Sequence, residues 1–504
     1  MISKILLVLI CILFLFTRFY KISEIPSSVY WDEASIGYNA YSIVQTGRDE
    51  WGKFLPLHFR AFGEFKLPVF IYTVAAFVKI LGLNEYAIRL PALFYSLGVI
   101  ILTFLLASKF TKDESIGLWS SFLVVISPWF FIFSRTGYEA TAGLMFYLLG
   151  IYLFLKYLGN RWSILFLTVS FILSAYSYNS FRIILPLTII PLILFGGSSL
   201  RQILTKQKAA ISISIILLIL TVIPIYRLFV YDTGGVRLKA IGNSSKLIFS
   251  SYISHFNPEF LFISGDKNLR SQQAGFGQFN LVEIILFPLG LLYIRKLKNR
   301  NLLLSLILIS PIPAAITKEF PHALRAVSLV PFFIIISAMG VTEIKKYIKQ
   351  KYLVEIAVTI ISSIFFTSYF INFVNVYPSQ SSKDWQFGYK RIYQDYASRF
   401  STYDQIVISD QYAQPYIFGL YYLRYNPNKF RQEVVRNSID QWGFSLVKGF
   451  NKFIFEKITF DSLPKGKSLI FATPIDQLTE ILPKELILNL DNSISFYVYE
   501  YNKK

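Results

Sequence analysis

The sequence predicts a mostly α-helical, polytopic membrane protein of about eleven transmembrane helices, followed by a small C-terminal α/β domain. Of the 504 residues, 54% are hydrophobic and only 16% are charged, and the mean hydropathy is +0.49. A soluble domain carries more charge than this. Long apolar runs such as 209–230 and 356–374 recur along the chain and can each cross a hydrocarbon core of roughly 30 Å. After Pro378 the composition becomes polar, which indicates a separate domain.

The apolar runs give the positions of the spans. We expect transmembrane helices at 3–20, 88–107, 117–134, 140–156, 162–179, 183–197, 209–230, 279–294, 301–316, 323–341 and 352–373. A further apolar stretch, 67–82, is short and contains Lys79. We therefore expect it to be an amphipathic, interfacial or re-entrant helix on the outer face.

The distribution of Lys and Arg predicts the orientation. Basic residues gather in short loops at 109–112, 156–161, 201–208, 295–300 and 345–351, which the positive-inside rule places in the cytoplasm. All of them can be cytoplasmic together with Lys4 only if 67–82 does not cross. This predicts a cytoplasmic N-terminus and an extracytoplasmic C-terminal domain. The low-charge, Tyr/Phe-rich composition fits a bacterial plasma membrane, with an archaeal one as the alternative. The first span has no small-residue cleavage site after it, so we expect it to be retained as an anchor.

Charge and cysteine content exclude several classes. The net charge of +20 is explained by the cytoplasmic loops, and no basic face interleaved with aromatic residues indicates nucleic-acid binding. The one cysteine, Cys11, excludes an internal disulfide and a cysteine-based metal site. No Gly-rich phosphate loop is present, which argues against ATP as energy source.

The chain divides into a membrane module, 1–375, and a C-terminal domain, 376–504. Strand-like runs at 405–410, 468–473 and 494–501, with helix-like stretches between them, predict an α/β domain. With this topology the polar segments outside the membrane are 21–66, 135–139, 180–182, 231–278, 317–322 and the tail after 374. The working face is therefore expected to be extracytoplasmic.

Two adjacent acids, Asp32 and Glu33, follow the first span directly, and Tyr30 and Trp31 precede them. Aromatic rings beside carboxylates suit a sugar, whose C–H face stacks on a ring while its hydroxyls bond to the acid. Neighbouring residues of a helix point in different directions, so one acid can face the reaction while the other orients it. The alternatives are a solvated loop acid and an interfacial aromatic belt.

Further ionisable residues lie at the outer ends of the predicted spans. Arg135 and Glu139 occupy one external turn, where charges are usually functional or paired with each other. A converging group of cations is what a lipid phosphate requires, and the candidates are Lys66, Arg182, His322 and Arg325. Snorkelling to lipid headgroups is the alternative for each.

The three histidines, His58, His255 and His322, are scattered without regular spacing. They give little indication of a metal, and no cofactor is required by the expected chemistry. If a divalent metal binds, Glu64 with His255 is the pair we expect to hold it.

Several motifs together resemble family 39 glycosyltransferases, relatives of protein O-mannosyltransferases and lipid A aminoarabinose transferases within glycosyltransferase superfamily C. They are the acidic pair after the first span, "KLP" opening the surface helix, "NEYAIRLPAL" (84–93), "SPWFFIFSRTGYEA" (127–140) and "PHALR" (321–325). The resemblance runs in order through 1–375. It implies that Asp32 matches the family's catalytic acid, Glu139 its second acid and Lys66 its lysine before the surface helix. The helix begins Leu-Pro where relatives often have Pro-Pro.

The resemblance implies transfer of a sugar from a polyprenyl phosphate carrier to an acceptor hydroxyl on the outer face. In this interpretation Asp32 is the general base, with Glu33 and Glu139 as further catalytic acids. Tyr30, Trp31 and Arg135 contact the sugar or the acceptor, and the cations bind the donor phosphate. Attack opposite the leaving phosphate inverts the anomeric centre. The acceptor is a protein, a lipid or a glycan.

Two other classes remain open from the residues alone. A polytopic transporter or lipid-linked sugar flippase would place ionisable groups near the membrane midplane and often has duplicated halves, whereas here the charges lie at span ends without a repeat. A scaffold that presents its external tail would not need Asp32.

Overall fold

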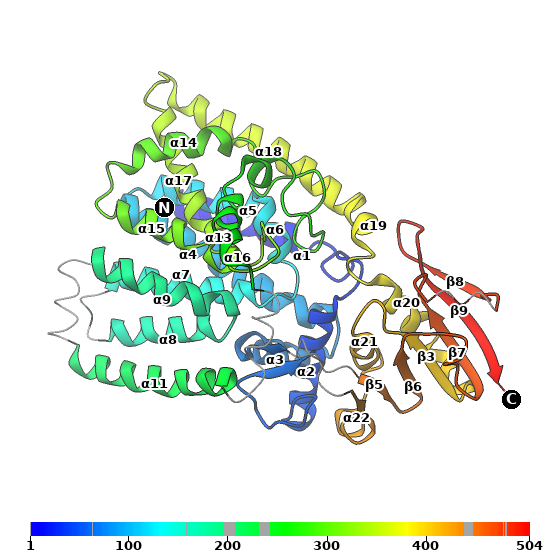
Figure 1. The fold of residues 1–504 in the computed structure, drawn as a ribbon. Helices are drawn as coiled ribbons and strands as arrows, with labels where there is room; N and C mark the ends of the chain where they lie inside the picture. The colour runs from blue at the N-terminus through cyan, green and yellow to red at the C-terminus, as the bar shows by residue number, and fades with distance from the viewer. Residues whose placement is uncertain are drawn as a thin grey trace. The chain divides into compact units, whose positions relative to one another are not determined.

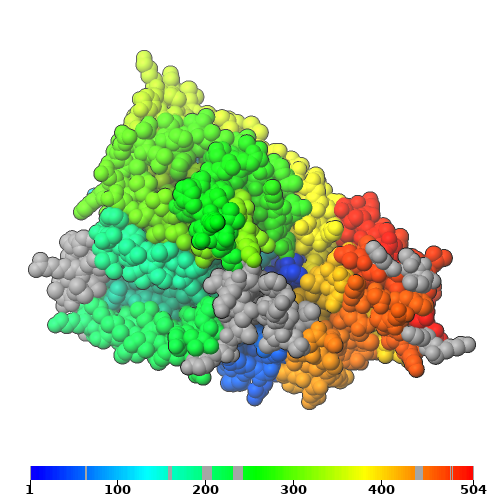
Figure 2. Space-filling model, viewed as in Figure 1, coloured from blue at the N-terminus to red at the C-terminus, as the bar shows by residue number. Residues whose placement is uncertain are grey.

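The computed structural model describes residues 2–62, 64–157, 160, 162–195, 207–230, 242–437, 447–476, 478 and 481–503 (Figures 1 and 2). Parts of the expected loops 156–161, 201–208 and 231–278 therefore lie outside the described residues. The chain forms two compact units. Unit 1 comprises 1–20 and 92–372, and unit 2 comprises 21–91 and 373–504. The predicted boundary at 375/376 stays a prediction, and the first loop belongs to the same compact unit as the C-terminal domain.

Unit 1 is helical. Its elements are α1 (Ile2–Phe19), most of α4 (Glu85–Thr111), α5 (Glu114–Ile126), α6 (Pro128–Phe133), α7 (Ala140–Tyr157), α8 (Ser163–Ala175), α9 (Asn179–Phe195), α11 (Lys208–Val230), α13 (Ser245–Ser254), a π-helical turn (Glu259–Ile263), α14 (Glu283–Ile294), α15 (Arg300–Ile309), α16 (Ile312–Ala315), α17 (Leu329–Ile344) and most of α18 (Lys351–Asn375). In Figure 1, α7, α8, α9 and α11 lie side by side, and α8 packs against the other three.

Each expected span overlaps a helix of this unit, although not every helix is long. Among the described residues, four helices, α1, α4, α11 and α18, are long and apolar enough to cross a membrane. Shorter apolar helices of this unit are α5, α7, α8, α9, α14, α15 with α16, and α17. The chain is therefore a multi-pass membrane protein, while the number of spans and their orientation stay predictions. The external turn expected at 180–182 is wrong, because α9 begins at Asn179.

Close packing in unit 1 depends on small residues where helices cross. A Cβ atom added to Gly290 of α14 would lie 1.8 Å from the Ile336 carbonyl oxygen, and one added to Gly340 of α17 would lie 2.0 Å from the Leu286 oxygen. The two helices thus touch backbone to backbone, as helix pairs in membranes commonly do. Nearly all of α17 is buried, since it also packs against α5 and α15.

Unit 2 contains two parts of the sequence. The first loop forms α2 (Trp31–Thr46), the hairpin β1 (Phe59–Ala61) and β2 (Glu64–Lys66), and α3 (Pro68–Leu81), which lies where the surface helix is expected. The C-terminal part forms α19 (Tyr377–Ser381), α20 (Phe387–Asp395), a 3₁₀ turn (Ala397–Thr402), β3 (Gln405–Ser409), α21 (Pro415–Tyr422), α22 (Pro427–Glu433), β4 (Val435–Arg436), β5 (Val447–Phe450), β6 (Phe453–Glu456), β7 (Gly466–Ala472), β8 (Glu485–Leu488) and β9 (Ile494–Lys503).

The C-terminal strands form one sheet in the order β4-β5-β6-β3-β7-β9-β8. The central strand β3 is parallel to β6 and β7, and the other pairs are antiparallel. The three strands expected from sequence coincide with β3, β7 and β9, so the α/β assignment is confirmed. In Figure 1 the strands lie beside α20 and α21, and α21 also packs against α2.

Candidate active site

The first acid of the pair, Asp32, lies in the first turn of α2 and contacts the lysine at the end of β2. Lys66 Nζ donates to Asp32 Oδ1 at 2.6 Å. The lysine is 6% exposed, whereas Asp32 is 22% exposed and open to a reactant. The adjacent ammonium stabilises the ionised carboxylate. Two residues 34 positions apart, both expected from sequence, are thus brought together.

The second acid, Glu33, is occupied by an arginine of α4. Arg89 Nε donates to Glu33 Oε1 at 3.1 Å and Nη2 donates to Oε2 at 3.0 Å, and both side chains are almost completely buried. Arg89 also donates to the backbone oxygens of Ile22, Pro26 and Ser28. Both carboxylate oxygens of Glu33 accept hydrogen bonds from Arg89, so the catalytic role expected for Glu33 has no geometric support. This arrangement is typical of a positioning residue. Sequence reasoning missed Arg89, although an arginine in an apolar helix requires a partner.

The aromatic residues before the acids pack on one another. The rings of Tyr30 and Trp31 are 4.6 Å apart, and Tyr30 also meets Trp385 edge-on at 6.4 Å. Trp31 is partly exposed and lies 6.3 Å from Phe62. Trp31 therefore presents part of its ring next to Asp32, whereas Tyr30 is buried and fixes the start of α2.

A third acid of the first loop, Glu50, joins α2 to α21. Its carboxylate accepts from Tyr416 Oη at 3.0 Å and from Asn39 Nδ2 at 3.2 Å, and it is 1% exposed. Burial, with a smaller contribution from the nearby Asp49, raises the pKa of Glu50 to about 7. Unfolding returns the group to an ordinary pKa of about 4.3. The native state therefore holds this proton more tightly, and its stabilising effect is lost as pH rises from about 4.3 through about 7.

We expect Glu50→Gln to remove this pH dependence. The wild-type melting temperature should fall between pH 5 and pH 8 by more than that of the variant, because only the wild type must bury a charge at pH 8. A glutamine can still accept from Asn39 and donate to Tyr416. Melting followed in detergent at both pH values checks this, and equal pH profiles would refute the assignment.

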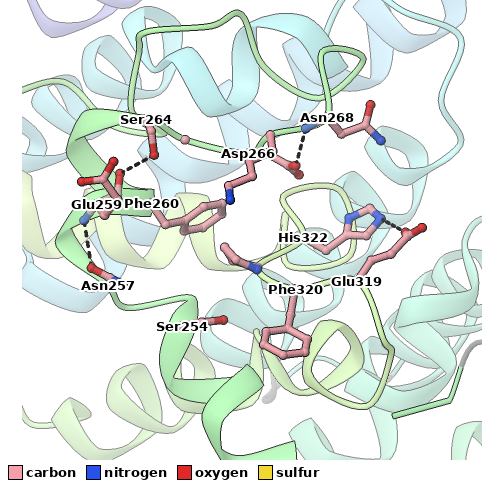
Figure 3. A pocket seen from close by; sticks show the side chains of 13 residues that line it. Ser254, Asn257, Glu259, Phe260, Ser264, Asp266, Asn268, Glu319, Phe320 and His322 are labelled. Atoms are coloured by element: carbon pink, nitrogen blue, oxygen red, sulfur yellow. Dashed lines mark hydrogen bonds and ion pairs between the residues drawn. The ribbon is translucent and has the colours of Figure 1, made fainter. Parts of the chain in front are cut away.

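In unit 1 a pocket of about 470 Å³ lies between the π-helical turn and the segment before α17. It is lined by Ser254, Asn257, Glu259, Phe260, Ser264, Gly265, Asp266, Lys267, Asn268, Glu319, Phe320, Pro321 and His322. Figure 3 shows His322 directed toward Glu319, with 3.6 Å between His322 Nε2 and the carboxylate. Asp266 accepts from the Asn268 and Ala323 backbone N–H groups, which fixes both walls.

Two donor-phosphate candidates expected from sequence lie at this pocket or next to it: His322 lines it, and Arg325 contacts Glu319 in its wall. Arg325 Nη2 lies 3.7 Å from the same Glu319 carboxylate, and Nη1 donates to Thr317. Burial and the neighbouring Arg325 hold the pKa of His322 well below its usual range, so His322 is neutral at pH 7 and offers a hydrogen bond instead of a charge. Lys267 supplies a further cation that sequence reasoning missed, because an isolated loop lysine carries no distinguishing pattern.

The metal site expected at His255 is not supported. His255 Nδ1 lies 2.8 Å from the Ser251 carbonyl oxygen, and Nε2 accepts from the His322 backbone N–H at 3.1 Å, so neither ring nitrogen has a lone pair to give. Burial lowers the pKa of His255 to about 4, consistent with this neutral form. Its proposed partner, Glu64, belongs to unit 2, and the Glu64 side chain lies outside the described part of the chain.

The remaining candidates are placed near helix ends of unit 1. Arg135 is fully buried and donates to the backbone oxygens of Thr17 and Tyr20, so it closes the C-terminal end of α1 and has no exposed surface for a sugar. The structure gives no support for the sugar contact expected for Arg135, which stays a prediction. Glu139 precedes α7 and is 8% exposed, and Arg182 lies in the first turn of α9, where Nε donates to the Ala175 oxygen. The helices α7 and α9 pack together.

Residues 66–226 match the family model described as dolichyl-phosphate-mannose-protein mannosyltransferase. The resemblance to family 39 glycosyltransferases is confirmed. The matched segment begins at Lys66, the residue that contacts Asp32, and continues through α11. No curated protein sequence matches the chain.

Two solved structures share the fold over nearly the whole length. The structure of ArnT from Cupriavidus metallidurans bound to undecaprenyl phosphate has a TM-score of 0.65 at 10% identity and covers 98% of this chain and 97% of its own. The structure of the same protein in the apo state has a TM-score of 0.58 at 10% identity, covering 92% and 93%. At this identity the likeness concerns the fold alone.

Proposed function

We propose that this protein is a membrane glycosyltransferase that moves a sugar from a polyprenyl phosphate carrier to an acceptor hydroxyl on the extracytoplasmic face. The observation that carries the proposal is the pair formed by Asp32 and Lys66, an accessible acid beside a buried cation. One structure with the same fold holds undecaprenyl phosphate, which supports a carrier of this kind. The matched family model points to sugar transfer from a phosphate-linked lipid.

The chemistry assigned to this pair is a single displacement. The acceptor oxygen forms a bond to the anomeric carbon as the bond from that carbon to the phosphate oxygen breaks. Asp32 takes the hydroxyl proton, a general-base contribution worth about 10²–10⁴-fold. The phosphate leaves with the electron pair and needs no proton, but its charge needs a cation, which Lys66 supplies. Attack opposite the phosphate inverts the anomeric centre.

The other site residues have supporting roles in this proposal. Glu33 positions the first turn of α2 through Arg89. His322 and Arg325 stay predictions as donor-phosphate contacts, and so does Arg182. Glu139 stays a prediction as a second acid.

Purified protein in proteoliposomes, supplied with a panel of polyprenyl-phosphate sugars and a membrane extract as source of acceptors, tests the function. A transferase releases free polyprenyl phosphate in proportion to the sugar transferred. A flippase changes the leaflet of the intact donor and cleaves nothing. Movement of uncleaved donor without carrier release would overturn the proposal in favour of transport.

We expect Lys66→Met to weaken binding of undecaprenyl phosphate by about 10–100-fold, because a hydrogen bond to a charged group contributes about 1.5–3 kcal/mol. Tryptophan fluorescence titration in detergent measures the affinity. The control is Lys79→Met, which changes an exposed lysine of α3 in the same unit. Equal affinity in wild type and Lys66→Met would remove Lys66 from the phosphate site.

A further inference from the structure

The C-terminal sheet has an edge at which the ends of three parallel strands meet. The carboxyl edge consists of 409–414 after β3, 456–458 after β6 and 473–476 after β7. In open α/β sheets, ligands bind outside the carboxyl ends of the parallel strands. They bind at the switch point, where successive connections run toward opposite edges of the sheet. The central strand here is β3, with β6 on one side and β7 on the other.

One acid, Asp476, holds the carboxyl edge in place by accepting three hydrogen bonds. Asp476 accepts from the Ile458 backbone N–H and from both the backbone N–H and the hydroxyl of Thr473. These bonds tie the ends of β6 and β7 together. Asp410, by contrast, is partly exposed, and Gln411 Nε2 donates to its Oδ1 at 3.1 Å. The edge therefore has a fixed frame and an accessible carboxylate.

Two buried polar groups near this edge have no hydrogen-bond partner among the described residues. The Tyr389 hydroxyl is fully buried on α20, and burial first, followed by the neighbouring Tyr393, Asp410, Tyr412 and Asp476, raises its pKa. Gln414 is 4% exposed, and its Oε1 also lacks a donor. Buried polar groups are nearly always satisfied, so such groups next to an accessible edge call for a ligand.

The carboxyl edge is connected to the helix that carries Asp32. Gln386 accepts from the Trp31 backbone N–H at 3.3 Å and donates to the Tyr412 carbonyl oxygen at 2.8 Å. One side chain thus bonds both the first turn of α2 and the loop after β3. Gln386 thus links the loop after β3 to the start of α2 within one compact unit.

The chemistry of the edge selects the kind of molecule. Glu456, the last residue of β6, is a charge neighbour of Asp410, since burial and then Asp410 raise its pKa. With Gln414 Oε1 these carboxylates offer several acceptors, so the ligand must bring several donors. Their negative charge disfavours a phosphate or carboxylate ligand. A sugar brings hydroxyl donors on adjacent carbons, and the partly exposed Tyr412 offers a ring for its C–H face. A peptide brings a carbonyl for each N–H, and those carbonyls would face the same carboxylates.

We propose that the carboxyl edge binds the acceptor and that this acceptor is a neutral, hydroxyl-rich glycan. The inference rests on the transferase function proposed above and adds the acceptor class to it. Tyr389, Asp410 and Gln414 bond to its hydroxyls, and Tyr412 stacks on its ring.

The experiment compares wild type with Tyr389→Phe, Asp410→Asn and the control Tyr393→Phe. Tyr393 lies one turn further on α20, and its buried hydroxyl also has no hydrogen-bond partner among the described residues, but it lies near Gly419 of α21. Saturation-transfer NMR uses methyl glycosides of glucose, galactose, mannose and N-acetylglucosamine, with a Ser/Thr peptide and glucose 1-phosphate as competing classes. Melting temperatures confirm that each variant folds, and loss of an unpartnered hydroxyl should not lower them.

We expect at least one neutral glycoside to bind the wild type and Tyr393→Phe equally. Its affinity should fall about 2–10-fold in Tyr389→Phe, the value of one neutral hydrogen bond, and about 10–100-fold in Asp410→Asn. The inference is overturned if no glycoside binds, if only the peptide or the phosphate binds, or if Tyr389→Phe binds as wild type does. Binding requires no donor, so donor cleavage measured separately shows whether the proposed function fails instead.

Discussion

Asp32→Asn should lower the turnover number for sugar transfer by about 10²–10⁴-fold, the usual contribution of a positioned general base. Asparagine keeps the size of the side chain and still offers an oxygen to Lys66, but it cannot accept the proton of the acceptor hydroxyl. The KM for the donor should change little, because the donor phosphate is not bound by this acid. Initial rates of polyprenyl phosphate release at saturating donor and acceptor measure the effect.

Glu24→Gln is the matched control. Glu24 lies in the same loop but is 67% exposed and only 4.0 Å from Lys21, a surface pair that contributes little to stability. This variant should keep wild-type turnover. If Asp32→Asn turned over as fast as Glu24→Gln, Asp32 would not be the base, and the pair with Lys66 would be structural.

The second large effect is on stability. Glu33→Gln leaves the fully buried Arg89 guanidinium without a counter-charge, and breaking such a pair costs about 3–5 kcal/mol. The loss should spread to the loop before α2, because Arg89 also holds the oxygens of Ile22, Pro26 and Ser28. Thermal unfolding in detergent, with limited proteolysis of residues 21–30, measures both consequences.

A double variant, Glu33→Gln with Arg89→Met, distinguishes the effect of the uncompensated Arg89 charge from the effect of the lost hydrogen bonds. Replacing both partners removes the uncompensated charge, so the double variant should be more stable than Glu33→Gln alone. The loop before α2 should remain sensitive to protease in the double variant. Arg89→Met removes the hydrogen bonds to the backbone oxygens of Ile22, Pro26 and Ser28. A single variant as stable as wild type would show that the buried pair is not what fixes α2.

Much of the fold could be predicted from sequence because its signals are long and local. Apolar runs located helices such as α11 and α18, and the alternating runs in the tail located β3, β7 and β9. The helix α2 was not expected, since its sequence, WDEASIGYNAYSIVQT, mixes polar and apolar residues. The short strands β4, β5, β6 and β8 have two to four residues each, too few to give a pattern.

The site could be predicted only in part, because pairing between distant residues leaves no local signal. Asp32 and Lys66 were both expected, but nothing in the sequence showed that they touch. Asp32 and Glu33 are adjacent acids, and the sequence does not show which of them is paired. The structure places Arg89 beside Glu33. The surroundings of Arg135 could not be predicted, because its partners include backbone oxygens at the end of α1, which no spacing of side chains predicts.

The configuration of the transferred sugar tests the central claim, direct attack by an acceptor activated at Asp32. Wild-type protein would be given a donor of known anomeric configuration, and the anomeric proton coupling of the first-formed product would be read by NMR. One displacement predicts the inverted anomer. The retained anomer would contradict the account, because it requires two displacements and would make the acid a nucleophile instead of a base.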